Sequence, residues 1–144
     1  THKKPLVVKL APDLTEPQID DALGCCLENN IAGIIATNTT LSREGLPSSA
    51  PSTGGMSGKP LFSKSVPMVS QLSKKLGGKL PIIGVGGVSS AEDVITMLKA
   101  GARLVELYTA LVYEGPSLIK KIKKDLIKIM DQDGVKNISD YTTS

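Results

Sequence analysis

Residues 80–90, LPIIGVGGVSS, decide the fold class of this chain. Pro81 stands where a strand can begin, a position at which proline is tolerated. The β-branched residues Ile82, Ile83 and Val85 show no polar alternation, which is typical of a parallel strand covered on both faces. Gly86 and Gly87 then permit a tight turn. Ser89 and Glu92 form the S-x-x-E pattern that caps the start of a helix. The stretch therefore predicts a buried strand, a turn and a helix start.

The glycine pair has two interpretations. Bare backbone N–H groups beside a helix N-terminus favour an anion, most often a phosphate. A plain strand-to-helix turn explains Gly86 and Gly87 equally well, because short glycine-rich signals are weak. Both interpretations stay open at this point.

The composition predicts one globular domain. The chain has 144 residues, of which 40% are hydrophobic and 22% charged, and this is enough for one core. No apolar run approaches the roughly 20 residues of a membrane-spanning helix. The net charge of +3, the absence of Trp and the single Phe argue against nucleic-acid binding. Because the chain enters a strand almost at once and without an initiator Met, we expect it to be part of a longer polypeptide.

The two cysteines, Cys25 and Cys26, are adjacent on a helical pattern. Adjacent cysteines provide neither a disulfide framework nor the spacing of a zinc site. We therefore expect two buried small side chains in a reducing compartment, and no metal site.

Along the chain, four strands alternate with helices. Apolar runs predict strands at residues 5–10, 33–37, 82–85 and 103–107, and Thr15 with Gln18 forms a capping box for the first helix. Residues 41–59 form a long Ser-, Pro- and Gly-rich loop, of a length usually found in functional lids or disordered segments. Polar or glycine residues follow every strand: Lys9 and Asp13, Asn38 and Thr39, Gly86 and Gly87, Tyr108 and Thr109.

Repeated strand–helix units predict a parallel sheet with right-handed crossovers. A small open doubly wound sheet and half of a (β/α)₈ barrel both satisfy this pattern. An open sheet concentrates ligand groups at one switch point, whereas a barrel gathers them from every strand end, with phosphate after strands seven and eight beside a short extra helix. Residues 109–113 can form that helix. We therefore interpret the strands as numbers five to eight of a TIM (β/α)₈ barrel, with residues 1–144 as the C-terminal half of one domain.

Five motifs resemble the dihydroorotate dehydrogenase family, in its class 2, quinone-using branch. The motifs occur in the order and spacing of that family and cover most of the chain, and together they are specific. They are VKLAPD at residues 8–13, TNTT at 37–40, GGMSGKPL at 54–61, PIIGVGGVSS at 81–90 and LYTAL at 107–111.

The resemblance implies an FMN-dependent oxidation of (S)-dihydroorotate to orotate, with ubiquinone as electron acceptor, in pyrimidine biosynthesis. Lys9 matches the lysine beside the flavin ring, where a cation offsets the negative charge of the reduced cofactor. The remaining residues that match flavin contacts are Thr37, the backbone of Gly58 and Gly87, and Tyr108 and Thr109 at the phosphate end.

The same resemblance assigns the other ligands. Asn38 and Thr39 match residues that hydrogen-bond orotate. Leu111, Val112 and Pro116 resemble residues of the quinone tunnel, although ordinary packing explains them nearly as well. Glu106 departs from the family pattern, which often has an uncharged amide there, and a carboxylate in an apolar strand is expected to need a partner.

No catalytic residue is expected within this chain. The class 2 base is a serine in the first half of the barrel, and the helices that dock on the membrane precede it. We therefore expect a companion segment carrying strands one to four, and a protein at the mitochondrial inner membrane in a eukaryote or the inner membrane in a bacterium. Two alternatives remain open: a phosphate-binding barrel enzyme without flavin, and a non-enzymatic open-sheet domain that binds a partner through its long loop.

Overall fold

Four short parallel strands form one sheet with the sequential order β1-β2-β3-β4. The structure, a computed structural model, describes residues 4–51 and 53–142. A doubly wound sheet reverses its strand order at a switch point, and the sequential order observed here has no such reversal. The strands lie within the predicted ranges and are shorter: β1 (Val7–Leu10), β2 (Gly33–Ala36), β3 (Ile82–Gly84) and β4 (Leu104–Val105).

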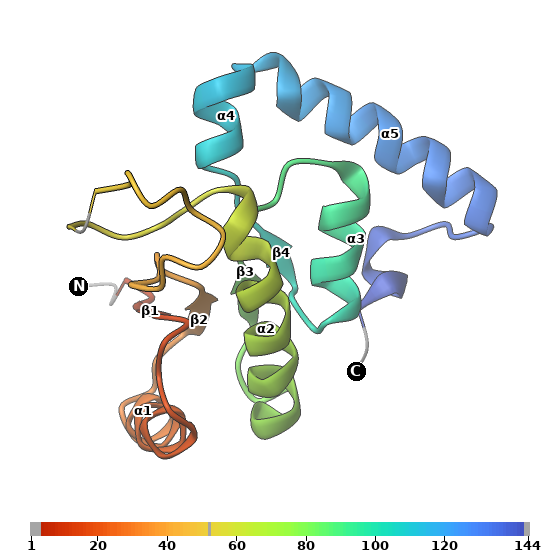
Figure 1. Cartoon of the computed structure of the whole chain (residues 1–144). Coiled ribbons are helices and arrows are strands. Elements are labelled where there is room, and N and C mark those ends of the chain that lie inside the picture. The colour runs from red at the N-terminus through yellow and green to blue at the C-terminus, as the bar shows by residue number, and fades with distance from the viewer. Residues whose placement is uncertain (1–3, 52, 143–144) are drawn as a thin grey trace.

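Helices connect the strands and follow one another along the sheet (Figure 1). Helix α2 contacts both β2 and β3, and α3 contacts β4. None of the helices in the described part of the chain is long and apolar enough to cross a membrane. The helical elements are α1 (Glu16–Glu28), the 3₁₀ turn η1 (Lys59–Leu61), α2 (Phe62–Leu76), α3 (Ala91–Lys99), α4 (Thr109–Glu114), α5 (Ser117–Asp133) and the 3₁₀ turn η2 (Ile138–Tyr141).

The core lies between the sheet and its helices. Side chains of a strand alternate between the two faces, and on the helix side Ile34, Ala36 and Ile82 are 0%, 0% and 2% exposed. They pack against the apolar stripe of α2, which includes the fully buried Val69 and Leu72.

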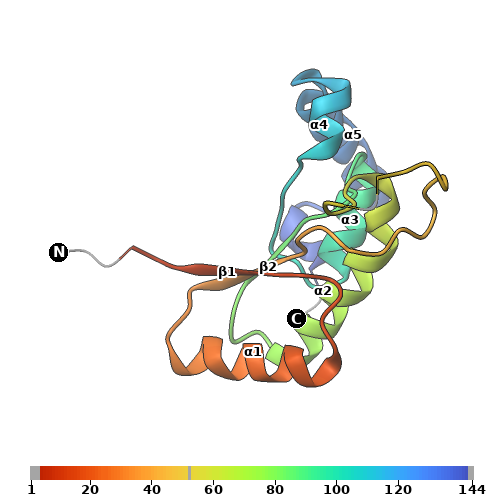
Figure 2. The same ribbon diagram turned by 60° about the vertical axis from the view of Figure 1, so that its left-hand side comes forward.

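The opposite face of the sheet carries no helix in the described residues. The strand register aligns one residue of each strand across this face: Lys9, Ile35, Ile83 and Leu104. Leu104 is 62% exposed. The outer edges of β1 and β4 have no partner strand among the described residues, and in Figure 2 residues 4–6, before β1, extend away from the rest of the molecule. An uncovered apolar face with two open edges is what part of a barrel interior looks like.

Two expectations about helices were wrong. The capping box of α3 uses Ser90 and Asp93: Asp93 N donates to Ser90 Oγ, and Ser90 N donates to Asp93 Oδ2, both at 3.1 Å. Ser89 lies one residue earlier and also donates to Asp93. In α1, Cys26 is buried and Cys25 is exposed, because neighbouring residues of a helix point about 100° apart. The predicted box of Thr15 and Gln18 is confirmed.

Candidate functional site

The carboxyl ends of the four strands open onto one cavity of about 550 Å³. This volume lies within the range of roughly 300–1,000 Å³ that is usual for small-molecule sites. The cavity brings together all of the residues that were predicted to contact flavin or orotate: Lys9, Thr37, Asn38, Thr39, Gly58, Gly87, Tyr108 and Thr109.

The end of β2 is fixed by the backbones of both neighbouring strands. Thr37 N donates to the Val85 carbonyl and Asn38 N donates to the Leu10 carbonyl, each at 2.7 Å. Thr37 is buried, whereas Asn38 and Thr39 are exposed at the cavity. The sheet therefore holds the main chain rigidly while two polar side chains remain available to a ligand.

Lys9 reaches the cavity from the helix-free face of β1, where it is aligned with Ile35. Its ammonium group forms no ion pair with any residue that the structure describes. The cavity thus contains an exposed cation beside the donors and acceptors at the end of β2.

The turn after β3 presents its backbone to the cavity. The amides of Gly86, Gly87 and Val88 donate to no other group within residues 4–51 and 53–142, and all three residues line the cavity. Gly87 has φ +79°, and a Cβ added there would lie 2.6 Å from both N and Cβ of Phe62. Only glycine fits, because the backbone of α2 closes one side of the turn. Amides without another acceptor, beside a helix N-terminus, are what an anion site would require.

The loop before η1 contacts the start of α4 across the cavity. Thr109 Oγ1 donates to Ser57 Oγ at 3.0 Å, and a Cβ on Gly58, which has φ +77°, would lie 3.0 Å from Thr109 Cγ2. The two predicted flavin contacts Gly58 and Thr109 are therefore neighbours, and a side chain at residue 58 would make a tight contact with Thr109.

The long loop of residues 41–58 is anchored at its base by Asp13. Its carboxylate accepts hydrogen bonds from Thr40 Oγ1 at 2.5 Å and from Leu41 N at 2.8 Å. The hydrogen bond from the Thr40 hydroxyl has the largest effect on the pKa of Asp13 and lowers it. Burial raises this pKa and the hydrogen bond from Leu41 N lowers it, so that the pKa lies below its usual value. Thr40 also pairs with Met56 through two backbone hydrogen bonds. These contacts keep the loop beside Thr39, against which Gly55 packs so closely that no side chain fits.

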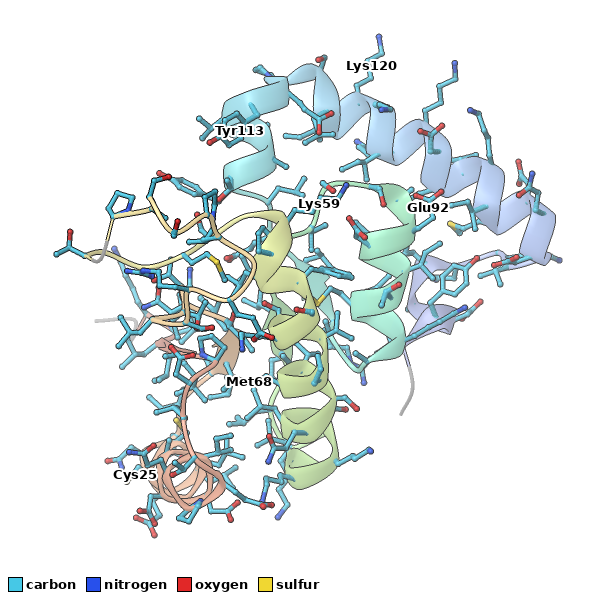
Figure 3. The ribbon with its side chains drawn as sticks, viewed as in Figure 1. Cys25, Lys59, Met68, Glu92, Tyr113 and Lys120 are labelled. Atoms are coloured by element: carbon cyan, nitrogen blue, oxygen red, sulfur yellow. The ribbon has the colours of Figure 1, made fainter. Side chains whose placement is uncertain are left out.

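The three predicted quinone residues lie outside this cavity. Leu111, Val112 and Pro116 belong to α4 or follow it and are not among the residues that line the cavity. Val112 is 71% exposed. Tyr113, on the left-hand side of α4 in Figure 3, does line the cavity, whereas Lys120 on α5 points away from the rest of the chain.

The sequence alone assigned no role in or beside the site to Glu106 or Ser65. Glu106 lines the cavity, and because it is exposed it does not need the buried partner that we expected. Ser65 is completely buried beneath the cavity and lies 3.0 Å from the Thr37 hydroxyl. Its place on the apolar stripe of α2, four residues before Val69 and seven before Leu72, is a signal that could have revealed it.

Comparison with known proteins identifies the family. The family profile described as dihydroorotate dehydrogenase matches residues 1–130. The chain belongs to the dihydroorotate dehydrogenase family. Among its relatives, a protein of Allorhizobium ampelinum named dihydroorotate dehydrogenase (quinone) is 47% identical over 145 residues, covering 99% of this chain and 40% of the relative. A protein of the same name from Christiangramia forsetii is 52% identical over 126 residues, covering 87% of this chain and 37% of the relative.

Solved structures of dihydroorotate dehydrogenase support the same family assignment. The ligand-free enzyme of Eimeria tenella has a TM-score of 0.88 and 39% identity, covering 95% of this chain and 38% of that one. The same enzyme in complex with ferulenol has a TM-score of 0.86 and 39% identity, covering 99% of this chain and 38% of that one. The four strand–helix units are therefore part of a dihydroorotate dehydrogenase barrel, and the open-sheet alternative is wrong. The chain spans about two fifths of the length of the relatives that it matches.

Proposed function

We propose that the complete protein containing this chain oxidises (S)-dihydroorotate to orotate with bound FMN, and passes the electrons to ubiquinone in pyrimidine biosynthesis. The main support is that every residue expected to contact flavin or orotate lines one cavity at the carboxyl ends of the strands. The names of the bacterial relatives point to the same reaction and to a quinone as acceptor.

The residues of the cavity fit FMN. Gly58 and Gly87 leave room where a Cβ would meet neighbouring atoms, and the amides of the glycine turn can receive a phosphate, beside Tyr108 and Thr109. Lys9 would lie beside the ring, where its positive charge stabilises a reduced, more negative cofactor. When bound, FMN accepts the two electrons removed from dihydroorotate and delivers them to the quinone.

Two exposed polar side chains at the end of β2 would hold the substrate. Asn38 offers an amide that both donates and accepts, and Thr39 offers a hydroxyl that can do either. Dihydroorotate and orotate carry carbonyl oxygens, ring N–H groups and a carboxylate, so mixed donors and acceptors suit them. We assign Asn38 and Thr39 to substrate orientation, since the hydrogen bonds of the sheet keep their backbone in place.

Helix α4 would form part of the quinone path. None of its residues is buried in the described structure, and Tyr108, Val112 and Tyr113 are 76%, 71% and 85% exposed. This apolar surface adjoins the cavity through Tyr113, which lines it. Leu111, Val112 and Pro116 are therefore proposed to contact a hydrophobic electron acceptor.

The remainder of the barrel would supply what this chain does not contain. We propose that strands one to four pair with the open edges of β1 and β4 and cover the row formed by Lys9, Ile35, Ile83 and Leu104. We assign the catalytic base, a serine, and the membrane-docking helices to that segment. The protein would dock on the mitochondrial inner membrane in a eukaryote and on the inner membrane in a bacterium.

The complete protein provides the test. It should copurify with FMN and reduce a ubiquinone analogue only when dihydroorotate is added. Lys9→Gln should lower the rate of flavin reduction by dihydroorotate, whereas Lys79→Gln, at an exposed lysine between α2 and β3, should not. A colourless protein, or quinone reduction that does not depend on dihydroorotate, would contradict the proposal.

A further inference from the structure

A buried hydroxyl on α2 lies directly behind the predicted flavin contact Thr37. Helix α2 packs across β2 and β3 (Figure 1), and its residue Ser65 is 0% exposed. Ser65 Oγ donates to the Leu61 carbonyl at 3.1 Å and lies 3.0 Å from Thr37 Oγ1. Thr37 lines the cavity, whereas Ser65 is not among its lining residues.

The number of protons decides the direction of the hydrogen bond between the two hydroxyls. A carbonyl oxygen can only accept, and a serine hydroxyl has a single proton. When Ser65 donates that proton to Leu61, both hydrogen bonds exist together only if Thr37 donates to Ser65. The Thr37 oxygen then has no proton left to donate, and only its lone pairs are available to a ligand.

The surroundings of Ser65 hold this arrangement in place. A Cβ on Gly86 would meet Ser65 Oγ, so the serine touches the turn after β3 as well as the end of β2. Thr37 is itself 2% exposed and its amide is bonded to Val85. Neither hydroxyl can move far, because buried polar groups that lose their partners carry a large desolvation cost.

We propose that Ser65 is a positioning residue that fixes the Thr37 hydroxyl as a hydrogen-bond acceptor for a ring N–H of the bound cofactor. This inference rests on the proposed function. The oxidised flavin ring carries one N–H, at N3, between two carbonyl oxygens. An acceptor-only hydroxyl selects that N–H and rejects the neighbouring carbonyls, so that Ser65 sets the register of the ring in the cavity without touching it.

The experiment uses the complete protein without cofactor and measures the dissociation constants of FMN and of N3-methyl-FMN, which lacks the N–H. Ser65→Ala and Thr37→Val should each weaken FMN binding about three- to fivefold, the typical effect of one hydrogen bond. The double variant should bind FMN no more weakly than Thr37→Val alone. Binding of N3-methyl-FMN should be unchanged in all three variants.

Ser63→Ala provides a matched control, since Ser63 is an exposed serine on the same helix and should leave both dissociation constants unchanged. Equal weakening of both flavins by Ser65→Ala, or single effects that multiply in the double variant, would show a general packing role and overturn the inference. If Ser65→Ala does not fold, Thr37→Val decides: it must weaken FMN alone. A wild-type protein that does not bind FMN would instead overturn the proposed function.

Discussion

Replacing Gly87 by alanine tests whether the turn after β3 is shaped by its contact with α2. An alanine at φ +79° costs about 1–2 kcal/mol of backbone strain. Its Cβ would also lie 2.6 Å from both N and Cβ of Phe62 and 2.8 Å from its Cα. These atoms belong to or adjoin the backbone of α2 and cannot rotate away, so overpacking adds about 1–3 kcal/mol. We therefore expect Gly87→Ala to destabilise the protein by about 2–5 kcal/mol.

Gly78→Ala is the matched control. Gly78 has φ +80°, nearly the same backbone conformation, and no atom lies within 4 Å of a Cβ added there. The control should lose only the strain of about 1–2 kcal/mol, as measured by urea unfolding of the complete protein without cofactor. Because Gly87 lines the cavity and Gly78 does not, only Gly87→Ala should also weaken FMN binding. Equal losses of stability in the two variants would refute the role of the Phe62 contact.

Two further predictions concern the pH dependence of stability. Hydrogen bonds from Thr40 and Leu41 lower the pKa of Asp13 from the usual value of 3.8. The ionised carboxylate therefore stabilises the fold above that value, and this effect is lost as the pH falls through the lower pKa of the folded state. The difference in stability between wild type and Asp13→Asn should shrink on acidification below about pH 4. Burial and the hydrogen bond to Asp133 raise the pKa of Tyr141 from 10.0 to about 12. The neutral Tyr141 side chain stabilises the fold below pH 10, and this effect is lost as the pH rises through about 12. The stability of Tyr141→Phe should therefore approach that of wild type between these two pH values. A stability difference that stays constant with pH, for either variant, would contradict the hydrogen-bonding role given to that side chain.

The architecture could be predicted because its signals are local. Apolar β-branched runs bounded by polar residues located all four strands, and the first capping box was located correctly. The second box was misplaced by one residue because Ser89 with Glu92 matches the S-x-x-E pattern, whereas the box that forms uses Ser90 with Asp93. The geometry of the preceding turn decides between them, and no local pattern encodes that geometry.

Residues of the candidate site could be predicted from the sequence only where they lie at the carboxyl end of a strand. Lys9 lies near the carboxyl end of β1, and Asn38 and Gly87 follow β2 and β3, so the three converge on one edge of a parallel sheet. Ser65 contacts Thr37 across 28 positions of the chain and lies within a helix. Such a contact depends on how α2 packs on β2 and β3, which neither propensity nor spacing specifies.

The described structure separates the features that this chain fixes by itself from those that depend on the rest of the barrel. The glycine turn and Thr37 are held by α2 through Phe62 and Ser65, so the proposed cofactor side of the cavity is formed within residues 4–51 and 53–142. Ile83 and Leu104, in contrast, lie on the uncovered inner face. Substitutions on α2 should therefore change cofactor affinity first. Substitutions of these two apolar residues should act chiefly through assembly of the complete barrel, because the proposed strands one to four would cover them.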